Sequence, residues 1–460
     1  MMRWCWTGAY GAIERRHIVS HAAAEAAATA SQKVALVVGS TGVVGAALLD
    51  ILPSPDTPAG PWKVYALSRG RLPPWSAPEG APSSSNPNPN TNPVVHLHVD
   101  LADPAAVAQA LQPLADITHV FYTAWSACPG ATEEEAREAN CDMLRNVLSA
   151  VVPSCPALVH VCLQTGRKQF VDPFEPLSGI SAAIAAMRPY PEDVPRLEYS
   201  DLEDVLLDEV AHSWLNGAAA ITWSVHRPAT VFGFSPRSES NVIASLRVYA
   251  AICRKEGAAL RWPGSRVAWE GFSDASDAEL VAEHALWAAL EPGGKNETFN
   301  CTNGDVYKWK NLWPMLAEHF EMEWSGYDGE DKRFKLEEAM AGKEALWGEI
   351  VREKGLVETE LNDITAWWFV DALINADKEQ LENMNKSKEH GFLGFRNTMT
   401  RRSRVSKTLK TLVSSSSLRK TNITSARSTQ KTLKNTRRMS PSRLPVLEDF
   451  VVTLRRYLFV

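Results

Sequence analysis

The stretch that decides the fold is VALVVGSTGVVGAALL, residues 34–49. Its first five residues (34–38) are all apolar, which is typical of a strand buried on both faces of a parallel sheet. Residues 46–49 are good helix formers. Between the two lies a turn with Gly39, Gly42 and Gly45. A strand, a glycine-rich turn and a helix in this order predict a dinucleotide-binding site.

Each of the three glycines has a role in such a turn. The first permits the tight turn, the second lets a pyrophosphate approach the backbone, and the third lets helix and strand pack closely. The N–H groups and the dipole of the following helix attract phosphate. The spacing is GxxGxxG rather than GxGxxG, so an ordinary tight turn is the alternative. We expect cofactor contacts from Gly39, Thr41, Gly42, Val43, Val44 and Gly45.

Length and composition indicate a globular protein. The chain has 460 residues, of which 45% are hydrophobic, so it can bury a sizeable core. No apolar run approaches the ~18 residues of a membrane helix, and the N-terminus lacks the apolar core of a signal peptide. The seven cysteines include no C-x-x-C pair, which favours reduced thiols in the cytoplasm and no metal site.

Charge divides the chain into two unlike parts. Residues 401–460 hold 15 Lys and Arg against two acids, a net charge of +13. Because the whole chain carries −6, the first 400 residues carry −19. An acidic globule is therefore followed by a basic tail.

Apolar runs alternate with helical segments beyond the first helix. We predict strands at 62–67, 94–99, 118–123, 157–163 and 221–226, with helices at 133–151 and 201–211. This alternation predicts an α/β fold with a doubly wound parallel sheet. From 241 onward, Trp-rich helices with a short strand at 297–301 suggest a smaller, mostly helical C-terminal lobe over the substrate. The predicted parts are an N-terminal arm (1–32), a dinucleotide-binding domain (33–240) with a low-complexity insertion (73–93), a substrate-binding lobe (241–397) and the basic tail (398–460).

The end of the second strand predicts which dinucleotide is bound. An acid there would bind the ribose 2′-hydroxyl of NAD, whereas an arginine suits the 2′-phosphate of NADP. The chain has Ser68 and Arg69, with Arg71 close by and no acid, which favours NADP(H) over a merely solvated arginine. Asp100, before Leu101, either bonds to the adenine or caps the next helix. Further cofactor contacts are expected from Leu101, Thr123, Ala124, Thr165 and Val231.

The usual catalytic pair of short-chain dehydrogenases, Y-x-x-x-K, is absent. None of the nine tyrosines has a lysine four residues later. Either the protein is not a catalyst, or its tyrosine and lysine come from different segments.

Five motifs point to a family. LQTGRK (163–168), SVHRPATVFGFSP (224–236), NGDVYKWK (303–310), WWF (367–369) and MNKSKEHGFLGFRN (384–397) together resemble the plant progesterone 5β-reductase and iridoid synthase family. The resemblance implies a Rossmann-type, extended short-chain reductase fold. It also implies NADPH-dependent 1,4-reduction of a small apolar enone, such as a steroid, an iridoid precursor or a smaller enone.

The same resemblance assigns the catalytic residues. It implies that Lys168 pairs with a tyrosine just before the D-L-E-D helix, here Tyr199, to stabilise the enolate. The segment PRLEYSDLED (195–204) is about four residues shorter than the family pattern, which has two adjacent tyrosines preceded by Asn-Phe. Aligned on the helix, Tyr199 takes the catalytic position. Aligned on 195–197, it matches an earlier tyrosine, and nothing takes that position.

The resemblance also suggests the wall of the substrate pocket. Trp125 and Phe369 lie in motifs that imply a wide apolar pocket, and Asn241 could face the ligand. For any of the sixteen tryptophans, core packing is the alternative. We expect a homodimer.

The tail breaks the resemblance at Thr398. Ser, Thr, Lys and Arg follow without periodicity, which indicates disorder. We hypothesise a gene-model error there, because a close match stops abruptly; a genuine tail would leave an apolar patch on the lobe. Nucleic-acid binding rests on the tail alone, which has no aromatic residue between Phe395 and Phe450, so we expect neither a nucleic-acid nor a membrane partner. The main rival to a reductase is a catalytically silent NADP(H)-binding sensor or scaffold.

Overall fold

The structure is a computed structural model that describes residues 32–70, 94–128, 130–167, 200–215, 220–235 and 237–399. The predicted arm except Gln32, the insertion 73–93 and the tail beyond Met399 lie outside the described residues.

The centre of the molecule is a parallel sheet of seven strands. Its order is β10-β6-β5-β4-β1-β2-β3, and every neighbouring pair is parallel. Without β10 this is the 3-2-1-4-5-6 order of the doubly wound dinucleotide-binding fold, so the predicted fold class is confirmed. The strands are β1 (Val34–Val38), β2 (Lys63–Ser68), β3 (Val94–His98), β4 (His119–Tyr122), β5 (His160–Gln164), β6 (Thr222–Pro228) and β10 (Glu297–Cys301).

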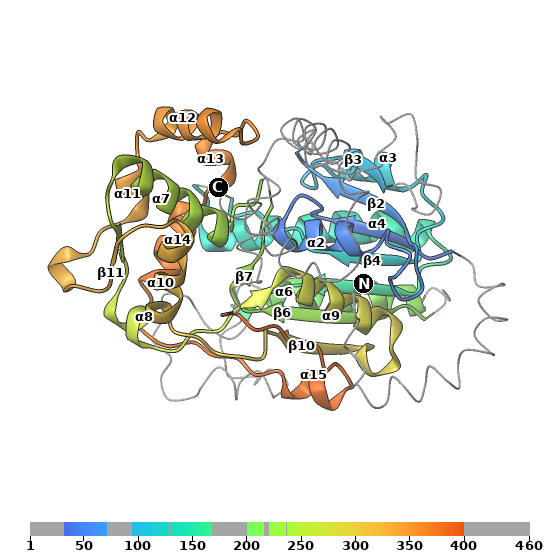
Figure 1. Cartoon of the computed structure of the whole chain (residues 1–460). Coiled ribbons are helices and arrows are strands. Elements are labelled where there is room, and N and C mark those ends of the chain that lie inside the picture. Colours follow the sequence, from blue (N-terminus) through green and yellow to red (C-terminus); the bar gives the residue numbers. More distant parts are fainter. Residues whose placement is uncertain are drawn as a thin grey trace, which may run out of the picture.

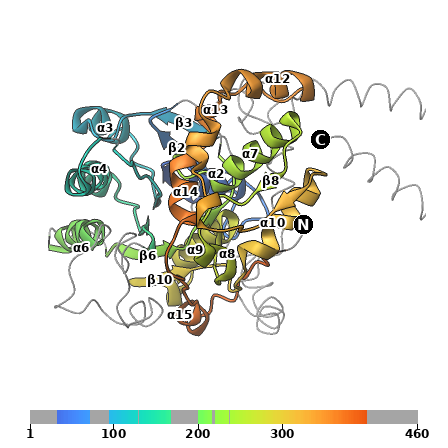
Figure 2. The same ribbon diagram turned by 90° about the vertical axis from the view of Figure 1, so that its left-hand side faces the viewer.

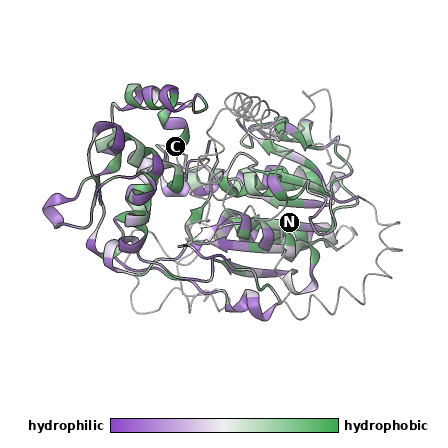
Figure 3. Ribbon diagram, in the orientation of Figure 1, coloured by the Kyte–Doolittle hydropathy of each residue, from purple (hydrophilic) through white to green (hydrophobic). Residues whose placement is uncertain are grey.

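Helices cover both faces of the sheet (Figures 1 and 2). Side chains of β1 alternate between two apolar clusters: Leu36 and Val38 join one, and Ala35 and Val37 join the other. The first cluster lies under α3 (Pro104–Leu111), α4 (Glu133–Ser154) and α6 (Ser200–Leu215), and the second under α2 (Val43–Ile51) and α9 (Ala278–Leu290). Burial on both faces explains why the strand at 34–38 has no polar residue. By contrast, the outer helix α15 (Asn385–Glu389) is hydrophilic (Figure 3).

The strand at 297–301 lies elsewhere than expected. We predicted it within the substrate lobe, but β10 pairs with β6 and forms an edge of the central sheet. Phe299 on β10 packs in the same cluster as Trp287 of α9 and Phe392. The physical reason is that β6 would otherwise be an open edge, which β10 and α9 cover. The chain therefore returns to the dinucleotide-binding layer after it enters the lobe.

The lobe has its own aromatic core. The Trp262 ring lies 5.2 Å from that of Trp269, 5.6 Å from that of Trp309 and 5.0 Å from that of Trp313. All four tryptophans are buried, so core packing accounts for them. The remaining elements are β7 (Val231–Phe232), α7 (Val242–Glu256), β8 (Leu260–Arg261), α8 (Arg266–Glu270), β9 (Ser276–Asp277), η2 (Pro292–Gly294), α10 (Trp309–His319), β11 (Trp324–Ser325), η3 (Glu330–Lys332), α11 (Leu336–Met340), α12 (Glu344–Lys354), α13 (Leu361–Ile364) and α14 (Trp367–Ile374).

Apolar side chains are exposed near the end of the described chain. Phe395 is 69% exposed, Leu393 is also exposed, and both line a cavity of about 300 Å³ with Gly304 and Asp305. The origin of the tail stays a hypothesis. Within the described ranges, no helix has the length and apolarity needed to cross a bilayer. The six cysteines in those ranges are free thiols.

Buried histidines form a hydrogen-bonded chain through the sheet. His160 Nε2 lies 3.0 Å from Ser224 Oγ, which lies 2.9 Å from His226 Nε2. His226 Nδ1 lies 2.7 Å from His284 Nδ1, and His284 Nε2 lies 3.0 Å from Ser387 Oγ. Burial lowers the pKa of His226 to about 3 and that of His160 and His284 well below the usual value. The three imidazoles are therefore neutral in the folded protein.

The unfolded chain binds protons on these histidines below pH ~6.5, whereas the folded chain does not. We expect the free energy of unfolding to fall as the pH drops from about 6.5 toward 3, by roughly 1.4 kcal/mol per pH unit for each such histidine. His119 adds to this effect, because burial lowers its pKa to about 3. Urea unfolding of His119→Leu should show a shallower acid slope. The exposed control His212→Asn should keep the original slope, and equal slopes in all three proteins would contradict this account.

Candidate functional site: the crevice at the carboxyl ends of β1, β2, β4 and β5

The glycine turn lies where the strand order reverses, between β1 and β4. Gly39 has a φ of +82°, and a Cβ added to it would lie 2.7 Å from the backbone nitrogen of Ala124. A Cβ added to Gly45 would lie 2.2 Å from the carbonyl oxygen of Gly39. Only glycine meets both requirements, so these two residues bring β1, α2 and the end of β4 together. Ligands of open α/β sheets bind at this switch point.

The N-terminus of α2 is suited to a phosphate. Its N-cap is Gly42, with no side-chain cap and no acidic residue in the first turn. A Cβ added to Gly42 would meet only the Gly39 carbonyl, at 3.2 Å. Val43 and Val44 are buried toward the sheet, and Thr41 is partly buried. The turn thus offers backbone N–H groups and a helix dipole to an anion, which fits a dinucleotide pyrophosphate.

The predicted ribose subsite lies at the end of β2. Ser68 is buried, and its Oγ donates to the Gly70 carbonyl at 2.8 Å. The Arg69 side chain is 65% exposed. Arg71 lies outside the described residues. A guanidinium in this position is accessible to a phosphate.

At the end of β3, the structure separates the two roles considered for Asp100. The N-cap of α3 is Asp103, whose Oδ1 accepts from Ala105 and Ala106 N–H. Asp100 is exposed, and its Oδ1 accepts from Ala102 N–H at 3.1 Å. Asp100 is therefore not the helix cap, and its adenine contact stays a prediction. Leu101 is buried beside it.

The remaining predicted cofactor contacts surround the same turn. Thr123 Oγ1 donates to the Val38 carbonyl at 2.9 Å, and Ala124 is the residue that Gly39 approaches. Val231 lies on β7, which contacts α2. These residues are in place to line the crevice.

A buried ion pair joins β5, β6 and α6. Arg227 donates to Glu203 through Nε at 2.9 Å and through Nη2 at 2.5 Å. Thr165 Oγ1 donates to the same carboxylate at 3.4 Å. Both charged side chains are about one-tenth exposed, so each charge is stabilised by the other away from water.

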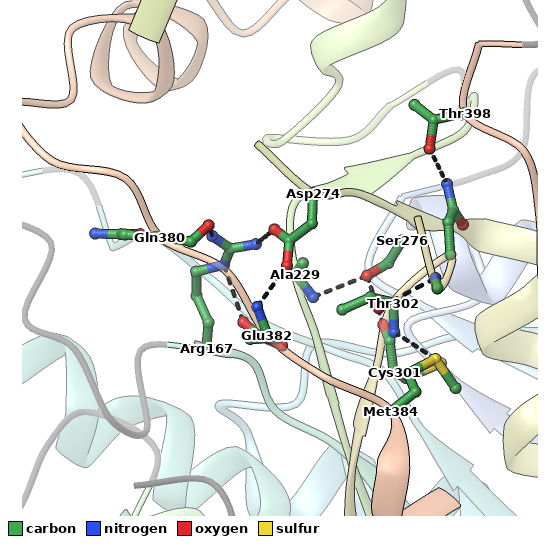
Figure 4. A network of polar contacts seen from close by, with 12 residues as sticks. Arg167, Ala229, Asp274, Ser276, Cys301, Thr302, Gln380, Glu382, Met384 and Thr398 are labelled. Carbon is green, nitrogen blue, oxygen red and sulfur yellow. Dashed lines mark hydrogen bonds and ion pairs between the residues drawn. The ribbon is translucent and has the colours of Figure 1, made fainter. Parts of the chain in front are cut away.

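A second charged cluster follows β5 (Figure 4). Arg167 Nη2 donates to Asp274 at 2.5 Å, and its Nη1 donates to the Gln380 carbonyl at 3.3 Å. Its Nε lies 3.1 Å from Glu382 Oε1 without the alignment of a hydrogen bond. Burial raises the pKa of the Glu382 carboxyl to about 7, although Arg167 opposes this shift. The cluster ties the end of β5 to the segment before α15.

The two predicted catalytic residues, Lys168 and Tyr199, lie outside the described residues, as does all of the chain between them. Arg167 directly precedes Lys168, and α6 begins at Ser200 directly after Tyr199. The bond from Thr165 to Glu203 brings these two flanks together.

The predicted substrate residues lie in different parts of the fold, and their contact with substrate stays a prediction. Trp125 packs against the sheet cluster, whereas Phe369 packs against the aromatic core of the lobe. Asn241 is fully buried, and its Nδ2 donates to the carbonyls of Ser235 at 2.7 Å and Ile364 at 3.1 Å. It ties a loop to α13, and its predicted contact with substrate has no support in this arrangement.

We did not identify the charged residues that organise the site from the sequence. Glu203, Arg227, Asp274 and Glu382 come from separate segments, and no spacing in the sequence links them. Arg227 lies in the HRP motif and Glu203 in the DLED motif, and these motifs were the one sign in the sequence that the two residues matter.

This sheet order, with a glycine turn at its switch point, defines a Rossmann-type dinucleotide-binding protein. The family model described as "PRISE-like Rossmann-fold domain" matches residues 35–400. The chain belongs to this family.

Curated relatives agree with this assignment. The chain is 46% identical to an (S)-8-oxocitronellyl enol synthase of Nepeta cataria and 44% identical to the 3-oxo-Delta(4,5)-steroid 5-beta-reductase of Arabidopsis thaliana. Each match covers 86% of this chain and 95% of the relative. Among solved structures, an epimerase from Methanothermobacter thermautotrophicus is similar in fold, with a TM-score of 0.53 and 14% identity. That match covers 83% of this chain and 92% of the epimerase.

The close packing at Gly45 predicts a large effect of one methyl group. Gly45→Ala should lower the free energy of unfolding by about 2 kcal/mol or more and weaken dinucleotide binding, because the turn must open. The control is Gly348→Ala on α12, where an added Cβ meets only the flexible end of Arg352. That change should be neutral or stabilise by up to about 1 kcal/mol. Similar effects of both substitutions in urea unfolding would refute the role given to Gly45.

The buried ion pair predicts that two substitutions in the first turn of α6 differ in their cost to stability. Glu203→Ala leaves Arg227 buried without its carboxylate and should cost about 3–5 kcal/mol of stability. Asp201, also in the first turn of α6, forms a more exposed pair with Arg137 at 2.9 Å. Asp201→Ala should cost at most about 1 kcal/mol. A cost for Glu203→Ala no larger than that for Asp201→Ala would show that the pair does not hold α6.

Proposed function

We propose that this protein is an NADPH-dependent enone reductase that adds hydride to the β-carbon of an α,β-unsaturated carbonyl. Relatives that match nearly their whole length are an enol synthase and a steroid 5β-reductase by name. Such a reaction needs a dinucleotide site and an acid that faces the substrate carbonyl.

The observation that carries the mechanism is the bond between Thr165 and Glu203. Lys168 follows Thr165 by three residues, and Tyr199 precedes Glu203 by four. Three residues of chain span at most ~10 Å and four at most ~14 Å, so chain length allows the two side chains to reach a common point. The proposal takes the alignment on the helix, which gives Tyr199 the catalytic role.

Each residue of the site would have a separate role in the reaction. Backbone N–H groups at 43–45 and Arg69 would bind the phosphates of NADPH, which supplies the hydride when bound. The Tyr199 hydroxyl donates to the substrate oxygen as it becomes an enolate. The Lys168 ammonium lowers the pKa of that phenol and bonds to the ribose.

The substrate we propose is a small apolar enone, held between the lobe and the sheet. Trp125 and Phe369 are the aromatic residues we assign to its wall. We place the protein in the cytoplasm as a homodimer, in keeping with the sequence.

The test is NADPH oxidation with progesterone and with a small enone. We expect Tyr199→Phe to lower kcat by about 10²–10³-fold, because one donor to the oxyanion is lost, while NADPH still binds. Lys168→Ala should weaken NADPH binding as well. Equal rates for wild type and Tyr199→Phe would reject this mechanism. Tight NADPH binding without turnover of any enone would instead favour a silent sensor.

A further inference from the structure

An acidic side chain reaches the ribose subsite from a distant part of the sequence. Residues 68–71 contain no acid, which led to the prediction of NADP(H). In the structure, Glu239 Oε1 lies 3.5 Å from Arg69 Nη2. Its other oxygen, Oε2, accepts from Ala127 N–H at 3.0 Å. A carboxylate therefore stands between the ends of β2 and β4, beside the arginine expected to bind phosphate.

The segment that carries Glu239 is held across the crevice. Ser235 Oγ donates to the Thr41 carbonyl in the glycine turn. Arg237 lies beside Gly70, where an added Cβ would be 3.6 Å from its Nη1. Asn241 anchors the other end through its bonds to the Ser235 and Ile364 carbonyls. The position of Glu239 is thus fixed by contacts on both sides of it.

We propose that Glu239 sets the cofactor preference, so that the protein binds NADH as well as NADPH. This inference rests on the proposed function of the site. The carboxylate neutralises part of the Arg69 charge and repels a 2′-phosphate. The same carboxylate accepts a hydrogen bond from the ribose 2′-hydroxyl of NADH, as an acid after the second strand does in NAD-binding proteins. Glu239 and Arg69 together therefore discriminate less between NADPH and NADH than an arginine alone would.

The test measures dissociation constants of NADPH and NADH by quenching of tryptophan fluorescence in the full-length protein. Binding is measured without substrate, so the result does not depend on turnover. For wild type, we expect the two constants to differ by about tenfold or less. For Glu239→Gln, NADPH should bind about threefold more tightly and NADH about threefold more weakly, which shifts the ratio by about tenfold.

Two further variants complete the design. Glu321→Gln removes a comparable exposed partner, 3.1 Å from Arg254 in the lobe, and should leave both constants unchanged. Arg69→Ala should weaken NADPH far more than NADH. Two results would overturn the inference. One is a ratio of the NADH to the NADPH dissociation constant in Glu239→Gln that lies within about twofold of the wild-type ratio. The other is a wild type that binds NADPH more than about a hundredfold more tightly than NADH. Cofactor binding with this pattern but no enone turnover would reject the proposed function alone.

Discussion

The structure depends on the close contact between the glycine turn and the end of β4. Because Gly39 and Gly45 lack side chains, α2 can start directly above β1, and its uncapped N-terminus faces the point where the strand order reverses. The subsite proposed for the cofactor phosphates follows from that arrangement. A methyl group at either position would separate the layers that the rest of the chain packs against.

Around that turn, charged residues hold the ends of the strands in register. Arg227 and Glu203 join β6 to α6, and Arg167 joins β5 to Asp274. These side chains are buried, so each one stabilises the site only when its partner is present. The carboxyl edge of the sheet is therefore held by pairs of residues that are distant in sequence and close in space.

Much of this architecture could be predicted from the sequence. Strands buried on both faces are mostly apolar, so the run at 34–38 was recognisable without any alignment. Contacts between distant segments could not be predicted from the sequence, because no local pattern encodes them. The strand at 297–301 looked the same whether it belonged to the lobe or to the sheet edge. Likewise, Glu239 lies 170 positions from Arg69, and nothing in the sequence indicates that they meet.

The buried histidine chain has a consequence for the placement of protons. Ser387 donates to a backbone carbonyl of β10, so it must accept from the Nε2–H of His284. His284 then accepts at Nδ1 from His226, which in turn must accept at Nε2 from Ser224. At the other end, Thr222 Oγ1 donates to the Val159 carbonyl, so it accepts from the Nδ1–H of His160, whose Nε2 is then an acceptor that faces Ser224. Ser387 on α15 and Thr222 on β6 thus set the tautomers of the imidazoles from opposite ends, and two acceptor nitrogens face the single hydroxyl hydrogen of Ser224.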